Sequence, residues 1–148
     1  MYTINEIKQI RLQADELGLY APPLFWALPE SELVKICNGC GAESMPEWSR
    51  ELLTWLYRNY TAAHCIHDTE YELSDGTEIN RCEADAAFYE NCLILWKHKY
   101  GWSRWINPVA LYGLKKIRLA YRALQCCGRP AWKEAFEKRK AKENISNA

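Results

Sequence analysis

The feature that most constrains the fold is the scarcity of helix-breaking residues in the middle of the chain. Between Pro46 and Gly101 there is no proline and only one glycine, Gly76. Proline removes an N–H donor and glycine is too flexible for a helix interior, so a helix is expected on each side of Gly76. The sequence predicts helices over 47–71 and 78–100. The short Ser-Asp-Gly-Thr turn around Gly76 makes them antiparallel neighbours.

The flanking segments also have helical patterns. Apolar residues recur at spacings of three and four over 4–17, and Gly18 follows them. A short helix is expected over 29–36, and longer ones over 108–127 and 131–144. No strand-like alternation or internal repeat occurs. We therefore predict an all-α fold in one domain of 148 residues, built around two long antiparallel helices with helical extensions at both ends.

Composition limits the classes of function. The 19 Lys and Arg balance the 19 Asp and Glu, so any attraction to nucleic acid or an anionic bilayer must be local. The N-terminus lacks the apolar run of a secretory signal, and no segment has the roughly 20 apolar residues that span a bilayer. We expect a soluble chain made in the cytoplasm, with later release or incorporation into a particle left open. The seven cysteines are an odd number without an export signal, which favours reduced thiols over disulfides.

The turn allows a register to be calculated for the two long helices. His67 lies six residues before Leu73 and Asp85 lies seven after Glu78. At 1.5 Å per residue, each is about 9 to 10 Å from the turn, so the two side chains are level. Asp85 can then accept a hydrogen bond from one imidazole nitrogen and leave the other as a base. Tyr71, one helical turn beyond His67, can donate its hydroxyl to Asp85.

Asp68 follows His67 but is rotated by about 100° around the helix, so it addresses a different partner. A lone carboxylate at this place calls for a cation. Calcium prefers oxygen ligands, including backbone carbonyls, and the glycines of the 38–43 loop, Asn-Gly-Cys-Gly-Ala-Glu, allow carbonyls to be presented in a row. The sequence therefore predicts a water-activating pair beside a Lewis acid.

Together these residues resemble the secreted phospholipase A2 superfamily, including its short viral and microbial members. That superfamily joins a Gly-rich calcium loop to a helix with Cys-x-x-His-Asp-x-x-Tyr and a second helix with Asp. The stretch 63–71, Ala-His-Cys-Ile-His-Asp-Thr-Glu-Tyr, is similar to the first helix, with its cysteine two residues before the histidine rather than three. The stretch 81–88, Arg-Cys-Glu-Ala-Asp-Ala-Ala-Phe, looks like the second. The resemblance covers 38–92 and implies a phospholipase A2-like catalytic core there.

The resemblance also implies roles for individual residues. His67 would be the base for an attacking water, Asp85 would orient His67, and Tyr71 would support Asp85. Asp68 would be the side-chain calcium ligand. The remaining implied ligands are backbone carbonyls of the loop, those of Gly39, Gly41 and Glu43. The implied activity is calcium-dependent hydrolysis of the sn-2 ester of glycerophospholipids at a membrane surface, with water as the nucleophile.

Two other interpretations stay open. A zinc-stabilised helical protein is one, because cysteine and histidine are zinc ligands. Its donors would be Cys37, Cys40, His64 and Cys65. The other is a non-catalytic structural or lipid-binding module on the same scaffold, within an assembly such as a virus particle.

The segment 96–105 combines aromatic and basic residues, so it could dip into a lipid interface or, less favourably, stack on bases. The simpler interpretation for at least half of its rings is an aromatic core. The basic run over 115–122 is most simply the solvated face of an amphipathic helix.

Overall fold

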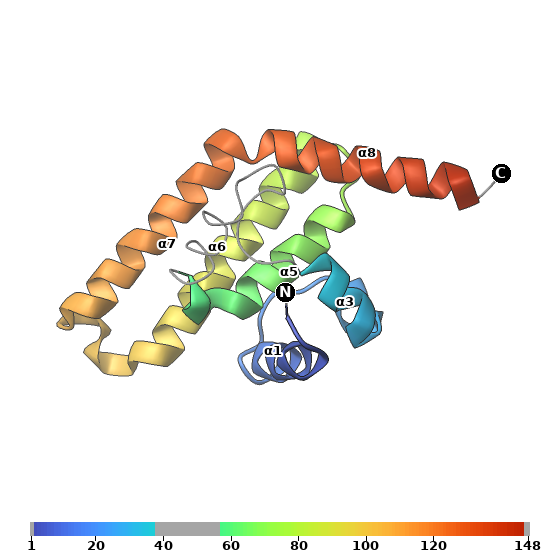
Figure 1. Ribbon diagram of the computed structural model, residues 1–148. Coiled ribbons are helices and arrows are strands. Elements are labelled where there is room, and N and C mark those ends of the chain that lie inside the picture. The colour runs from blue at the N-terminus through green and yellow to red at the C-terminus, as the bar shows by residue number, and fades with distance from the viewer. Residues whose placement is uncertain (1, 38–56, 147–148) are drawn as a thin grey trace.

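The computed structural model describes residues 2–37 and 57–146, and this part of the chain contains helices and no strand (Figure 1). The prediction of an all-α fold is therefore confirmed. The helices are, in chain order, α1 (Ile4–Glu16), α2 (Pro23–Ala27), α3 (Glu30–Ile36), η1 (Arg58–Tyr60), α5 (Thr61–Glu72), α6 (Glu78–Tyr100), η2 (Gly101–Trp105), α7 (Pro108–Cys127) and α8 (Arg129–Ser146). The short segments η1 and η2 are 3₁₀ helices.

The ends of the helices follow local chemistry. Thr3 caps α1 through a capping box in which its side chain and that of Glu6 bond each other's backbone N–H. Thr77 caps α6 by accepting from the backbone N–H of Asn80. Gly101 ends α6 with a φ of 50°, a conformation that side chains rarely adopt. The predicted limits of α1, α3, α6 and α7 are accordingly confirmed within a residue or two.

The prediction of one continuous helix over 47–71 is wrong in its described part. Residues 58–60 form the 3₁₀ turn η1, and α5 begins only at Thr61, after Tyr60 has adopted a non-helical φ of −121°. The part before residue 57 lies outside the described residues. Helix α2 was not predicted from the sequence; Pro23 occupies its first turn, where the missing N–H costs nothing.

As a result, the longest antiparallel pair is α6 with α7, and α5 lies along the other side of α6 (Figure 1). Gly113 lets α7 pass close to Tyr60 and Trp96, since a Cβ there would lie only 3.2 Å from the Tyr60 hydroxyl. The indole N–H of Trp96 donates to the Ala110 carbonyl over 2.8 Å. These contacts fix the hairpin that α6 and α7 form.

The N-terminal helices pack against α5 and are tied down by buried polar groups. The Asn91 side chain accepts from the backbone N–H of Tyr20 and donates to its carbonyl, both over 2.8 Å. Arg11 donates to the carbonyls of Phe25 and Leu28. The fully buried Asn91 and the partly buried Arg11 thereby fix how α1 and α2 sit on the core.

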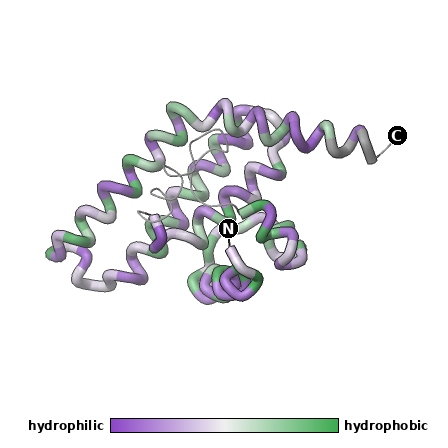
Figure 2. Tube along the Cα trace, in the orientation of Figure 1, coloured by the Kyte–Doolittle hydropathy of each residue, from purple (hydrophilic) through white to green (hydrophobic). Residues whose placement is uncertain are grey.

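Apolar side chains from the N-terminal helices, α5 and α6 form the core, including Ile7, Phe25, Leu33, Ile66 and Phe88. Figure 2 shows hydrophobic and hydrophilic residues mixed along each helix, as expected when only one side of a helix is buried. Among the described helices, none is long and apolar enough to cross a membrane.

Candidate functional site

The site is centred on Asp85, which accepts hydrogen bonds from two helices. On α5, His67 Nε2 and the Tyr71 hydroxyl each lie 3.0 Å from Asp85 Oδ1. The contacts predicted from the helix register are therefore present. Since a carboxylate only accepts, the proton between His67 and Asp85 belongs to Nε2, and Nδ1 keeps its lone pair.

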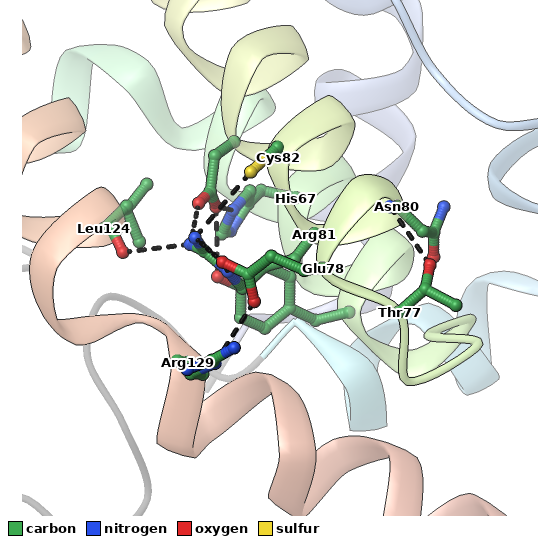
Figure 3. Close-up of polar contacts among 10 residues, drawn as sticks. His67, Thr77, Glu78, Asn80, Arg81, Cys82, Leu124 and Arg129 are labelled. Atoms are coloured by element: carbon green, nitrogen blue, oxygen red, sulfur yellow. Dashed lines mark hydrogen bonds and ion pairs between the residues drawn. The ribbon is translucent and has the colours of Figure 1, made fainter.

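The other oxygen of Asp85 accepts a hydrogen bond from Arg81, a contact that was not predicted from the sequence. Arg81 Nη1 lies 2.6 Å from Asp85 Oδ2, and both side chains are almost fully buried. Glu78 Oε1 accepts a hydrogen bond from the same guanidinium, 2.6 Å from Arg81 Nη2. This hydrogen bond and the nearby carboxylates raise the pKa of Arg81. Arg81 also donates to the Leu124 carbonyl, which joins the site to the end of α7 (Figure 3). The available signal was the i, i+4 spacing of opposite charges on α6.

Aromatic rings enclose the pair. The His67 ring centroid lies 4.2 Å from that of Tyr71 and 5.0 Å from that of Phe88. Tyr71 in turn meets Trp132 of α8 edge to face, with centroids 4.7 Å apart. Burial and the neighbouring Asp85 raise the pKa of the Tyr71 hydroxyl, so it stays a hydrogen-bond donor. At Gly128, a Cβ would come within 2.9 Å of that hydroxyl, so glycine lets the chain pass here.

The accessible part of the site is small. His67 is 6 % exposed and Asp85 1 %. Among the described residues, the hydrogen bond of His67 is made through Nε2, so Nδ1 is available to take a proton. Geometrically the arrangement is that of an oriented general base.

Two further titratable groups on α5 lie one helical turn from His67. His64 Nε2 is enclosed although the residue as a whole is only partly covered, and burial followed by the nearby His67 lowers its pKa to about 3. Glu70 Oε2 is enclosed without a hydrogen bond from the described residues, and burial followed by Asp85 raises its pKa to about 8. Both groups are therefore mostly neutral near pH 7, so neither adds a charge beside His67.

The calcium half of the predicted site is described only at Asp68, which is partly buried on α5. The other expected ligands, Gly39, Gly41 and Glu43, lie outside the described residues. Within the described ranges no cluster of three or more His, Cys, Asp or Glu side chains could hold a metal. Of the predicted calcium ligands, Asp68 is therefore the one that lies within the described residues.

The cysteines near the site are not as expected. Cys37 and Cys65 form a disulfide, with their Cα atoms 5.0 Å apart, because the end of α3 packs against α5. The expectation of reduced thiols is wrong for this pair and holds for the four cysteines found free, which are Cys82, Cys92, Cys126 and Cys127. Sulfurs bonded to each other cannot act as thiolate ligands, so the zinc alternative loses two of its four donors. The disulfide joins Cys37, which immediately precedes residues 38–43 in the chain, to Cys65, which lies three residues before Asp68 on α5.

Comparison with known proteins adds no identification: no family model, curated protein or solved structure matches the chain. The site must therefore be interpreted from its own chemistry.

Proposed function

We propose that the chain is a calcium-dependent hydrolase of the phospholipase A2 type, which cleaves the sn-2 ester of glycerophospholipids at a membrane surface. The observation that carries the proposal is the 3.0 Å contact between His67 Nε2 and Asp85 Oδ1, with Tyr71 on the same oxygen. With the shared proton on Nε2, this contact leaves Nδ1 as the base of the proposed reaction. His67, Asp68 and Tyr71 match the His-Asp-x-x-Tyr pattern, and this match is the reason for proposing the phospholipid ester rather than another ester.

Each residue of the site has a defined task in such a reaction. His67 Nδ1 takes a proton from water as the water oxygen attacks the ester carbonyl, and Asp85 stabilises the imidazolium that results. The same proton then passes to the departing alkoxide when the ester C–O bond breaks, which yields a fatty acid and a lysophospholipid. Tyr71 and Arg81 hold the two oxygens of Asp85, so the imidazole stays in one orientation. When bound by Asp68 and the carbonyls of Gly39, Gly41 and Glu43, calcium would supply positive charge for the ester oxygen.

The test is fatty-acid release from phosphatidylcholine vesicles in calcium and in EDTA. We expect release to need calcium and to fall by roughly 100-fold or more in His67→Gln and Asp85→Asn, because each removes general-base catalysis. His98→Gln is the matched control, since His98 is exposed at the far end of α6 and should keep full activity. Activity that survives either chelation or His67→Gln would overturn the mechanism.

A second candidate is a non-catalytic structural or lipid-binding module on the same scaffold. It is favoured by the enclosure of His67, which is 6 % exposed and packs against Tyr71, which in turn contacts Trp132. This candidate is selected if folded protein releases no fatty acid from any phospholipid in the presence of calcium. Stoichiometric zinc in the purified protein would instead revive the zinc alternative.

A further inference from the structure

The charges of the chain are unevenly distributed, although they balance overall. From Asn91 to Lys133 there is no Asp or Glu but nine Lys or Arg. This stretch comprises the second half of α6, η2, α7 and the start of α8. All of the acidic residues lie elsewhere, several of them in the first half of α6, so the second half of α6, η2 and α7 form a local basic region.

The end of this hairpin exposes large apolar side chains. We define the hairpin tip as Trp102, Trp105, Ile106 and Val109, which are 82, 62, 71 and 63 % exposed. They belong to η2 and the first turn of α7, which form the far end of the hairpin in Figure 1. The Arg104 guanidinium lies over the Trp105 ring, 5.0 Å from its centroid. The tip therefore combines indole rings, branched aliphatic groups and a cation.

A row of basic side chains runs from the tip along α7. We define the basic stripe as Lys115, Arg118 and Arg122, which are all exposed and spaced by three and four residues. Helical spacing of this kind places them along one side of α7, away from the buried Gly113 and Ile117. The stripe ends near Leu124, whose carbonyl contacts Arg81 at the Asp85 site.

We infer that the hairpin tip and the basic stripe form a docking surface for a bilayer with anionic headgroups. Indole rings favour the interfacial region, aliphatic side chains enter the acyl boundary, and Lys and Arg pair with phosphate. Ile106 and Val109 decide against nucleic acid, because aliphatic groups gain nothing from stacking on bases. With α7 along the surface, the end that carries the Asp85 site lies next to lipid. That benefit to catalysis rests on the proposed function, whereas docking itself needs no hydrolysis.

The experiment is flotation with vesicles of ether-linked phosphatidylcholine, with and without ether-linked phosphatidylglycerol, because ether lipids bind without being cleaved. We expect binding to the anionic vesicles that is weakened by added salt. Trp102→Ala should reduce the partition coefficient roughly tenfold by removing exposed apolar area, and Lys115→Gln about fivefold by removing one charge. The matched controls are Leu12→Ala, 51 % exposed on α1, and Lys8→Gln, exposed on the same helix. Both should bind as the unaltered chain does.

The outcomes separate docking from hydrolysis. His67→Gln should float with vesicles normally, so docking without ester cleavage supports this inference even where the proposed function fails. No flotation with anionic vesicles, or equal losses in the tip and control variants, would overturn it. Binding to a single-stranded oligonucleotide at the same salt, in preference to vesicles, would overturn it as well and assign the surface to nucleic acid.

Discussion

At the scale of single residues, burial shifts the pKa values of the two titratable groups beside His67 in opposite directions. Folding lowers the pKa of His64 to about 3 and raises that of Glu70 to about 8, in each case mainly by burial. A buried group resists carrying charge, so the histidine loses its proton more readily and the glutamate keeps it. The unfolded chain binds the extra proton at His64 between about pH 3 and 6.5. At Glu70 the folded chain binds the extra proton, between about pH 4.5 and 8.

The Glu70 shift predicts that stability is lost as the pH rises. Stability falls where the folded state binds more protons than the unfolded state, so Glu70 destabilises the fold progressively from about pH 4.5 to pH 8, by at most about 1.4 kcal/mol per pH unit. Glu70→Gln cannot ionise, so we expect this variant to gain stability over the unaltered chain across that range. Urea unfolding at pH 5, 6, 7 and 8 measures the difference.

The exposed Glu83 on the neighbouring helix provides the control. Glu83→Gln removes an exposed carboxylate from the surface and sets the baseline with which the pH dependence of Glu70→Gln is compared. The interpretation of Glu70 fails if its variant shows the same pH dependence as this control, because the carboxyl would then titrate alike in both states.

Residue-level contacts were predictable where one geometric rule decided them. The level placement of His67 and Asp85 follows from the 1.5 Å rise and the short turn, and both contacts of Asp85 Oδ1 are present. Arg81 was not predicted, because an arginine on α6 can point to any of several acidic neighbours or to water. Only the packing of α7 against α6, which leaves Arg81 next to Leu124, selects Asp85.

At the scale of elements, the disulfide between Cys37 and Cys65 is the covalent link between α3 and α5. Both cysteines are fully buried, and 28 residues separate them. The connected segment includes residues 38–43, which contain the remaining proposed calcium ligands. A link that closes a loop of this length reduces the entropy of the unfolded chain.

We predict that Cys37→Ala/Cys65→Ala lowers the free energy of unfolding by about 3 to 4 kcal/mol, the amount expected for a loop of this size. Urea unfolding with and without a reducing agent measures it. The reductant should destabilise the unaltered chain and leave the double variant unchanged, and the exposed free Cys126→Ala should respond as the unaltered chain does. Identical unfolding midpoints with and without reductant would show that the link does not stabilise the fold.

Sequence patterns predicted elements well where a stop signal was strong and poorly where it was ambiguous. Thr77 and Gly101 bound α6 at the expected residues, because a side-chain cap and a positive φ are local properties. The start of α5 was missed, since 57–61, Tyr-Arg-Asn-Tyr-Thr, contains neither glycine nor proline and is compatible with a helix. The disulfide could not be inferred either, because pairing depends on how α3 docks rather than on cysteine spacing.

At the scale of the whole molecule, the Asp85 site and the hairpin tip lie at opposite ends of α6. Asp85 and Gly101 are 16 residues apart on one helix, which is about 24 Å at 1.5 Å per residue. Helix α7 spans the same length and returns to the site, where Leu124 meets Arg81. Changes at the tip therefore cannot alter the site by direct contact, but they can alter how the site meets an interface.

This separation predicts different behaviour of the tip and the site toward two forms of one substrate. Against a short-chain phosphatidylcholine dispersed below its micelle concentration, Trp102→Ala should hydrolyse at the rate of the unaltered chain, because Trp102 is 82 % exposed and distant from His67. Against anionic vesicles the same variant should need roughly tenfold more lipid to reach half of its maximal rate. His67→Gln should lose activity toward both forms. Equal loss by Trp102→Ala in the two assays would mean that the tip affects the site itself, so that interfacial docking and hydrolysis are not separate properties of this fold.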